Sequence, residues 1–194
     1  MRIALVTPAG PGMRNGNRHT ALRWAAFLRA AGHRVDVSVQ WNRDPGTDAM
    51  LALHARRSYA SIKAFPRDKP LVVALTGTDV YRDIHQSEEA RESLELAHRL
   101  IVLQPKALEE LAPGFRRKAS VVVQSSAARL RHAPVKKCFR ICVVGHLRAE
   151  KDPMRTFYAM ASVPEQNLRV IHLGAPLDPL LASEAKAGAT FKLL

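Results

Sequence analysis

The chain has 194 residues, of which 47% are hydrophobic and 24% are charged, a balance typical of a globular protein rather than a disordered one. Its formal net charge of +13 favours an anionic partner or substrate over a cationic one. An arginine-rich composition also follows from a GC-rich genome, so charge alone does not identify the partner. The opening MRIALVTP is too short for a signal-peptide core, and no apolar run is long enough to cross a membrane. We therefore expect a soluble, cytoplasmic protein with no membrane partner.

The two cysteines, Cys138 and Cys142, lie four positions apart in a segment that reads as a strand. No second group of Cys or His residues accompanies them, so the spacing indicates neither a zinc site nor a redox pair, and no metal is expected. We interpret both as core thiols in a reducing compartment.

Short β-branched runs alternate with helical patterns along the first two thirds of the chain. Strands this apolar on both sides are typical of a parallel sheet covered by helices, so we predict an α/β fold with helices on both faces of a Rossmann-like sheet. Asn17 or Thr20 is expected to start the first helix, and Gly32 to end it in a left-handed conformation. The expected strands are 3–7, 35–39, 50–54, 71–77, 100–104 and 120–124, and the expected helices are 21–32, 87–97 and a short one from Pro105.

The segment 125–137 loses apolar periodicity and collects basic residues and a proline, as linkers do. We therefore predict an N-terminal domain at 1–128, a linker at 129–138 and the start of a second Rossmann-like domain at 139–194. After its last expected helix only ATFKLL remains, so this second sheet looks incomplete beside a doubly wound sheet of five or six strands. Its expected elements are a strand at 139–146, a helix opened by Asp152 and Pro153 and reaching Ser162, a strand at 168–174 and a helix at 179–188.

Ligands of open parallel sheets bind at the carboxyl ends of the strands, so the loop after each strand is a candidate site. The loop after the first strand, PAGPGMRNGNRHT, is rich in glycine and arginine and runs into a helix amino terminus, which favours a phosphate. Its glycine spacing is one residue longer than the dinucleotide fingerprint, and Gln40 stands where an acid is expected, which disfavours an NAD site. Purely structural glycines remain an alternative. The candidate phosphate-binding residues here are Gly12, Gly16, Asn17 and Arg18.

Two further loops follow the third and fourth expected strands. The first, HARRS, places the guanidinium groups of Arg56 and Arg57 at the sheet edge, where they suit phosphate oxygens or remain solvated. In the second, TGTDVYRD, Asp79 either accepts a sugar hydroxyl or caps the helix that follows. The same loop offers Thr76, Gly77 and Thr78 as hydroxyl and tight-turn positions.

The loop GHLRAEKD opens the second domain between a strand and a helix amino terminus. Cations are unfavourable beside that end of a helix unless an anion lies among them, which indicates a bound phosphate. The alternative is a solvated loop in which Arg148 and Lys151 pair with Glu150 and Asp152. The candidate anion-binding residues are Gly145, His146, Arg148 and Lys151.

Several segments together resemble the selenosugar synthases of selenoneine biosynthesis, which are GT-B glycosyltransferases. The segments are IALVTPAGPG, GNRHTALRWAAFLRAAGHRVDV, LALHARRS, VVALTGTDVYRD, RLIVLQP and VVGHLRAEKDPMRTFYAM, and they cover nearly the whole chain. HARRS and ALTGTDVYRD carry the most specific part of the likeness.

The resemblance implies two Rossmann-like domains facing a cleft, with UDP-N-acetylglucosamine held mainly by the second and selenophosphate, the acceptor, by the first. Selenium would attack the anomeric carbon and UDP would leave, with no cofactor besides the UDP-sugar. The resemblance also implies that the second-domain loop named above holds the diphosphate and that the first-domain loops hold the acceptor. His54 and Asp79 are the candidate catalytic residues, with His19 a further candidate base because Thr76 stands where relatives often carry a histidine.

Two departures from the family qualify this interpretation. His146 stands where relatives often have an arginine, with Arg148 two positions on. Family members also continue for more than a hundred residues past ATFKLL, through the acidic motif that grips the ribose and sugar. We therefore expect impaired activity in this chain, and self-association through uncovered apolar surface.

Two other functions compete with the transferase. One is a non-catalytic, phosphate-binding Rossmann-like module, for which phosphate would bind without turnover. The other is nucleic-acid binding, suggested by the net charge and by the basic linker residues Arg129, Arg131, Lys136 and Lys137. No nucleic-acid motif supports the latter, and aromatic residues are only 6% of the chain, few for stacking on bases.

Overall fold

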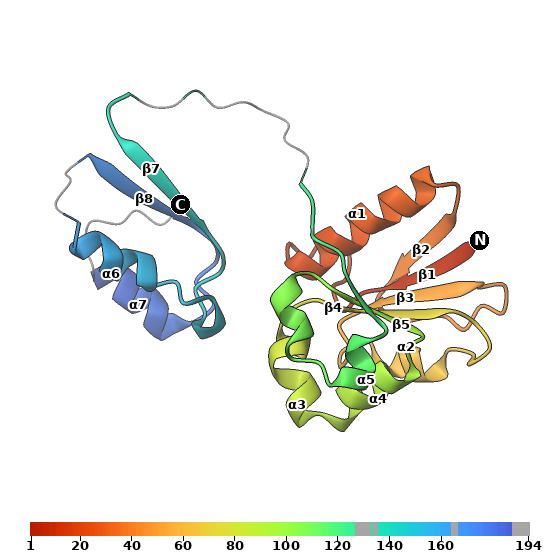
Figure 1. Cartoon of the computed structure of the whole chain (residues 1–194). Helices are drawn as coiled ribbons and strands as arrows, with labels where there is room; N and C mark the ends of the chain where they lie inside the picture. The colour runs from red at the N-terminus through yellow and green to blue at the C-terminus, as the bar shows by residue number, and fades with distance from the viewer. Residues whose placement is uncertain (127–132, 134–135, 164–166, 188–194) are drawn as a thin grey trace. The chain divides into compact units, whose positions relative to one another are not determined.

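A computed structural model of the chain describes residues 1–126, 133, 136–163 and 167–187. The chain divides into two compact units, 1–127 and 128–194, which are described separately (Figure 1). Most of the predicted linker at 129–138 and the whole of ATFKLL lie outside the described residues. No helix in the described part of the chain is long and apolar enough to cross a membrane.

The first unit is built on a six-stranded parallel sheet in the order β2-β1-β3-β4-β5-β6. The strand order reverses between β1 and β3, and such a switch point is where open α/β sheets bind their ligands. The strands are β1 (Arg2–Val6), β2 (Arg34–Ser38), β3 (Ala49–Leu53), β4 (Leu71–Leu75), β5 (Arg99–Val102) and β6 (Ala119–Val121). The helices are α1 (Gly16–Ala30), α2 (Tyr59–Ala64), a π-helical turn (Asp79–Asp83), α3 (Ile84–Gln86), α4 (Glu88–Leu96), a 3₁₀ turn (Pro105–Leu108) and α5 (Pro113–Arg116).

Helices cover both faces of this sheet, as the apolar strands predict. On one face, Ala21 and Ala25 of α1 pack against Leu5 and Leu53. On the other face, the core includes Ile62 of α2 and residues of α4. Figure 1 shows α1 on one side of the sheet and α2 and α4 on the other.

The ends of α1 show one confirmed prediction and one error. Gly32 has a φ of +86°, and the N–H of His33 donates to the Leu28 carbonyl at 3.0 Å, which is the expected left-handed ending. The predicted start at Asn17 or Thr20 is wrong, because the side chain of Asn15 already accepts the N–H of Arg18 at 3.0 Å and begins the helix at Gly16.

Two strands end earlier than the sequence pattern predicts. β4 ends at Leu75 rather than at residue 77, because the backbone N–H groups of Thr76 and Gly77 donate to the Asp79 carboxylate instead of extending the strand. β6 ends at Val121 rather than at residue 124. Helices α2 and α5, of six and four residues, were not predicted, since they are too short for a clear apolar period.

In the second unit, two parallel strands, β7 (Phe139–Val144) and β8 (Leu168–Leu173), pair in register. Leu147, Met154, Phe157 and Ala185 form its small core. The remaining elements are a 3₁₀ turn (Ala149–Lys151), α6 (Arg155–Ala161) and α7 (Pro179–Ala187).

Two predictions for the second unit are corrected. The helix does not open at Asp152, which takes a left-handed φ of +43°, so α6 begins only at Arg155. Cys142 is exposed and Cys138 is half-buried, so neither is a core thiol. Cys142 shares one face of the two-stranded sheet with Val144 and Leu173, both of which are also exposed.

Candidate functional site

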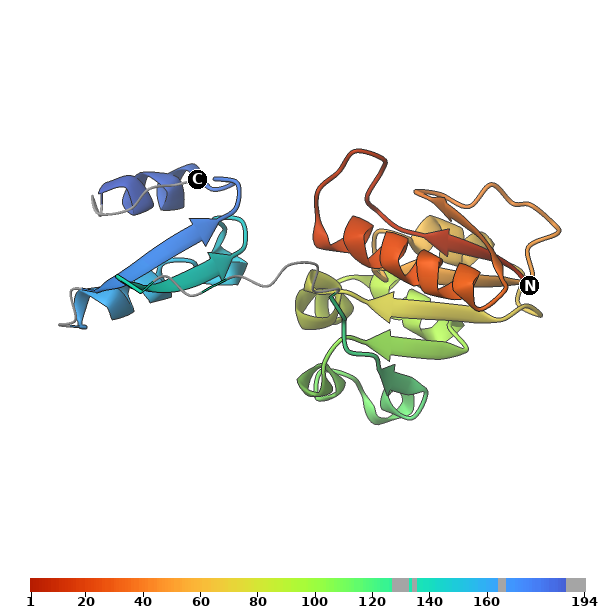
Figure 2. The ribbon, with the colours of Figure 1, turned by 90° about the horizontal axis from the view of Figure 1, so that it is seen from above.

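The carboxyl ends of β1, β3 and β4 bring several of the predicted residues to one edge of the first sheet. Thr7, His54 and Thr76 come directly after these three neighbouring strands. Figure 2 shows the strands pointing to the end of the unit where the loop before α1 and the Asp79–Asp83 turn lie. This edge adjoins the switch point between β1 and β3.

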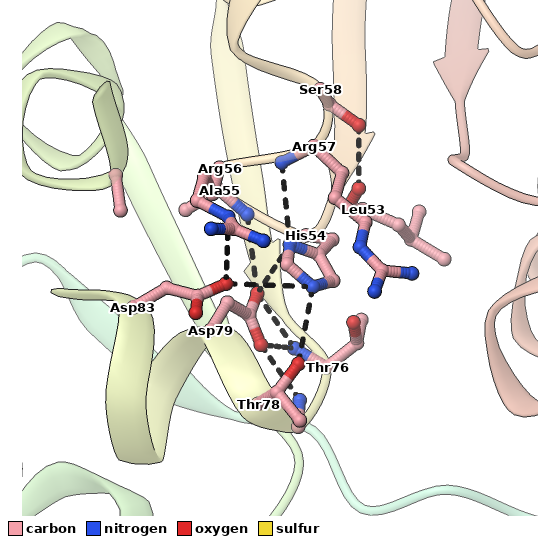
Figure 3. Close-up of polar contacts among 12 residues, drawn as sticks. Leu53, His54, Ala55, Arg56, Arg57, Ser58, Thr76, Thr78, Asp79 and Asp83 are labelled. Atoms are coloured by element: carbon pink, nitrogen blue, oxygen red, sulfur yellow. Dashed lines mark hydrogen bonds and ion pairs between the residues drawn. The ribbon is translucent and has the colours of Figure 1, made fainter. Parts of the chain in front are cut away.

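Asp79 joins the loops that follow β3 and β4. Its side chain is fully buried, and its carboxylate accepts the backbone N–H groups of Ala55 at 3.1 Å, Thr76 at 2.9 Å and Gly77 at 2.7 Å. These donors use both carboxylate oxygens (Figure 3). The geometry therefore favours a positioning role for Asp79 over contact with a sugar hydroxyl.

His54 is buried and has a left-handed φ of +73°, a strained conformation for a residue other than glycine. Its Nδ1 accepts the backbone N–H of Arg57 at 3.4 Å, and its Nε2 lies 3.3 Å from Thr78 Oγ1. This pattern places the proton of the neutral ring on Nε2, with the Thr78 hydroxyl as acceptor.

The surroundings of His54 lower the pKa of its imidazole below the ordinary 6.5. Burial is the main cause, because it disfavours the charged ring, and the guanidinium groups of Arg57 and Arg56 act in the same direction. The carboxylates of Asp79 and Asp83 oppose them. The ring is therefore neutral near pH 7.

Asp83 was not among the predicted residues but contacts two of them, His54 and Arg56. Its side chain is 3% exposed, and its Oδ2 lies 3.2 Å from Arg56 Nε and 3.9 Å from His54 Nε2. Its Oδ1 pairs with Arg82 Nε at 3.1 Å. The spacing of four residues from Asp79 was the available signal, because it places both carboxylates on one side of a helical turn.

Buried serine side chains hold the backbone of the HARRS loop, while its two arginine side chains reach the surface. Ser58 Oγ donates to the Leu53 carbonyl at 2.6 Å, and Ser93 Oγ of α4 donates to the Ala55 carbonyl at 2.9 Å. The side chain of Arg56 is 41% exposed, and Arg57 is an exposed residue. The loop thus presents two guanidinium groups on a rigid support.

The glycine-rich loop before α1 has a partly structural explanation. Gly12 has a φ of +83°, which favours glycine whatever the ligand. A Cβ at Gly16, the first residue of α1, would meet nothing within 4 Å, so packing does not require glycine there. Asn17 and Arg18 are half-buried in the first turn of the helix.

Two threonine hydroxyls at this edge are buried without a hydrogen-bond partner among the described residues. They are Oγ1 of Thr7, which the sequence analysis did not single out, and Oγ1 of Thr76. Both follow strands that neighbour β3, one on each side. They add polar atoms beside the arginine-bearing loop.

In the second unit, the candidate loop after β7 is held by histidines. His172 Nε2 lies 2.7 Å from the Gly145 carbonyl, and His146 Nδ1 accepts the Ala175 N–H at 2.9 Å. Arg148 Nε is buried without a partner in the described part of the chain. The side chain of Asp152 pairs with that of Arg155.

Two cavities of the first unit lie along α1 rather than over the arginine-bearing loop. The larger has a volume of about 540 Å³, and the smaller, of about 120 Å³, includes Gly16. Ser125 and Ser126 also line the larger cavity, and Gln124 and Ser125 also line the smaller one. Within the described residues, no group of three His, Cys, Asp or Glu side chains is arranged to hold a metal ion.

The sequence matches no family model and no curated protein. Among solved structures, a Listeria monocytogenes protein assigned as a UDP-N-acetylglucosamine 2-epimerase aligns with the whole chain and with 68% of its own length, at a TM-score of 0.59 and 13% identity. A structure of accessory secretory proteins 1, 2 and 3 from Streptococcus pneumoniae aligns with 87% of the chain and 33% of its own length, at 13% identity. Its TM-score of 0.39 is too low to support a statement about the fold.

The first of these likenesses bears on the fold alone. It agrees with the six-stranded parallel sheet and its two helical layers, and the predicted α/β fold of the GT-B type is confirmed.

Proposed function

We propose that the chain acts as a UDP-sugar-dependent glycosyltransferase whose first unit binds a phosphate-bearing acceptor at the carboxyl edge of its sheet. The observation that carries this proposal is the buried framework around Asp79, which fixes the HARRS loop and leaves the guanidinium groups of Arg56 and Arg57 at the surface. Guanidinium groups bind phosphate oxygens with paired hydrogen bonds. The GT-B type of fold supports the sugar-nucleotide part of the proposal.

The proposed acceptor is selenophosphate and the proposed donor is UDP-N-acetylglucosamine, on the strength of the motif resemblance. Selenium forms a bond to the anomeric carbon while the bond from that carbon to the UDP oxygen breaks, and UDP leaves with the electron pair. Water then cleaves the bond between selenium and phosphorus, which gives phosphate and a 1-selenosugar. The second-unit residues Arg148 and Lys151 would neutralise the departing diphosphate.

This reaction asks the protein mainly for positioning and charge stabilisation. The selenium of selenophosphate is already anionic, so its attack requires no general base. That agrees with a His54 side chain that is only 3% exposed and is held inside the loop. We assign His54 and Asp79 to the support of the acceptor loop.

The test compares two double variants in an assay of UDP release from UDP-N-acetylglucosamine and selenophosphate. R56Q/R57Q removes the proposed phosphate ligands, and R99Q/R117Q removes the same charge from residues that lie at or just before the amino ends of β5 and β6. Loss of a charged hydrogen bond costs about 1.5–3 kcal/mol, so kcat/KM should fall at least about tenfold in the first double variant alone. Equal kcat/KM in the two double variants would contradict the proposal.

A non-catalytic anion-binding module is the second candidate function. The burial of both His54 and Asp79 favours it, because neither side chain reaches the surface to contact a substrate. Calorimetry with selenophosphate and the UDP-release assay together separate the two functions, because a module would bind selenophosphate without any UDP release. UDP release would rule it out.

A further inference from the structure

The carboxylate of Asp83 lies between a half-exposed guanidinium group and a buried imidazole. Its Oδ2 is 3.2 Å from Nε of the half-exposed Arg56 and 3.9 Å from Nε2 of the buried His54 (Figure 3). Asp83 belongs to a π-helical turn, a rare conformation that occurs frequently at functional sites. His54 itself has a strained backbone. Asp83 and His54, whose side chains face each other, thus both belong to segments with an unusual backbone conformation.

The two buried carboxylates, Asp79 and Asp83, differ in the hydrogen-bond donors that surround them. Asp79 accepts three backbone N–H groups, so its charge is compensated by fixed donors. Asp83 Oδ1 accepts a hydrogen bond from Arg82 Nε at 3.1 Å, whereas Oδ2 has no hydrogen-bond partner in the described part of the chain and lies 3.2 Å from Arg56 Nε. Arg56 can turn toward solvent, whereas the backbone donors of Asp79 cannot. The environment of Asp83 is therefore the adjustable one.

We propose that Asp83 couples anion binding at Arg56 to protonation of His54. This inference rests on the proposed function, because it takes the ligand to be a tetrahedral dianion bound by the HARRS loop. When Arg56 pairs with the anion, Asp83 loses one of its two guanidinium counter-charges, and Arg82 stays on the other oxygen, Oδ1. Its Oδ2 then faces the imidazole without a cation beside it. The ring then takes up a proton, and Asp83 acts as a positioning residue for both groups.

The charges around the ring determine the direction of this coupling. Asp79 and Asp83 face it from the π-helical turn, and Arg56 and Arg57 from its own loop. A bound dianion offsets the two guanidinium groups, which otherwise lower the pKa of His54, so that pKa rises on binding. Nε2 already carries a hydrogen, so the new proton occupies Nδ1, which lies 4.0 Å from Asp79 Oδ2. The Arg57 N–H must then release Nδ1.

Two consequences follow for binding. Each bound anion brings a fraction of a proton from solution, and affinity rises as pH falls from about 7 toward the pKa of the unliganded ring, by at most about tenfold per pH unit for one proton. A rigid pair of surface arginines alone would show neither effect.

The test is calorimetric titration of the whole chain with inorganic sulfate, a tetrahedral dianion whose own charge is constant near neutral pH. Titrations at pH about 6.5 in two buffers of different ionisation enthalpy give the number of protons taken up. D83N, a substitution of the same shape, should bind sulfate with clearly less proton uptake than the wild type, and H54Q with none. E110Q is the matched control: it removes the carboxylate that lies 3.1 Å from the exposed His85 and should leave the uptake unchanged.

The outcomes separate this inference from the proposed function. Sulfate binding without proton uptake in the wild type, or equal uptake in D83N, would overturn the coupling and leave the anion site standing. Absence of sulfate binding in the wild type would overturn the anion site and the coupling with it. Reduced uptake in D83N, with binding retained and intrinsic tryptophan fluorescence unchanged, would support both.

Discussion

The two units hold the loops at their strand ends by different means. In the first unit, the carboxylate of Asp79 is fully buried and receives three backbone N–H groups. In the second unit, the imidazoles of His146 and His172 bond to backbone atoms instead, and Gly174 approaches so closely that a Cβ would lie 1.9 Å from the Gly145 oxygen. A buried charge thus fixes one loop, and close backbone contact fixes the other.

The packing of the sheets accounts for this difference. The first sheet has helices on both faces, and its central strands exclude water, so a fixed charge there acts strongly on its neighbours. Within the described residues the second sheet has two strands, and Val144 is 78% exposed. Electrostatic control of a ligand is therefore expected at the first strand edge, and the predictions below test that difference.

The largest effect is expected for D79A. It leaves three backbone N–H groups without their acceptor in a buried position, so the free energy of unfolding should fall by about 3–5 kcal/mol. Urea unfolding followed by far-ultraviolet circular dichroism measures it, because that signal reports on both units. The matched change D152A in the second unit breaks an exposed ion pair and puts alanine at a φ of +43°, so it should cost about 1–2 kcal/mol.

A pair of valine substitutions compares the two sheets directly. Val73 of β4 is fully buried, so V73A should cost about 2 kcal/mol through lost burial and the cavity left behind. V144A on β7 should change stability by less than about 0.5 kcal/mol. Far-ultraviolet circular dichroism during urea unfolding reports on both, and similar costs would contradict the difference in packing.

Acid should destabilise the first unit through His54. Its folded pKa is depressed, so the unfolded chain binds the extra proton between that value and about 6.5. The His54 contribution is fully present above about pH 6.5 and is lost below it, by about 1.4 kcal/mol per pH unit until the folded pKa is reached. H54Q should remove this slope from the unfolding free energy, whereas H85Q, at an exposed histidine, should keep it.

Apart from the control substitutions, the smallest effect is expected for G12A. Alanine at a φ of +83° is strained, but its Cβ would meet nothing within 4 Å, so the cost should be about 1 kcal/mol. G114A has the same open space without the positive φ and serves as the control. A loss of several kcal/mol in G12A would mean that this loop has tighter packing than described.

The strand pattern predicted the parallel sheet, because apolar β-branched runs leave few alternatives. It also pointed to Arg56 and Arg57, since residues after parallel strands meet at one edge. It did not distinguish a capping from a ligand role for Asp79, and it missed Asp83. The roles of Asp79 and Asp83 depend on their contacts with the HARRS loop, and tertiary packing rather than local sequence brings the two loops together.

The errors in the second unit have a similar origin. The apolar sequence around Cys142 predicts burial, but burial also requires a covering helix, which the described residues do not place on that face. At Asp152 the local sequence resembles a helix cap, whereas the residue adopts a left-handed turn. The apolar pattern of a sequence indicates a strand, but it does not show whether a helix packs over that strand.

The most direct test of the anion site is an NMR titration of the uniformly ¹⁵N-labelled chain with selenophosphate, with chemical shifts of assigned backbone amides as the readout. We expect saturable shifts at Arg56 and Arg57 and in the segments 12–18 and 76–78, with none at the amino ends of β4 and β5. Shifts confined to other surfaces, or no saturable shift at Arg56 and Arg57, would contradict it.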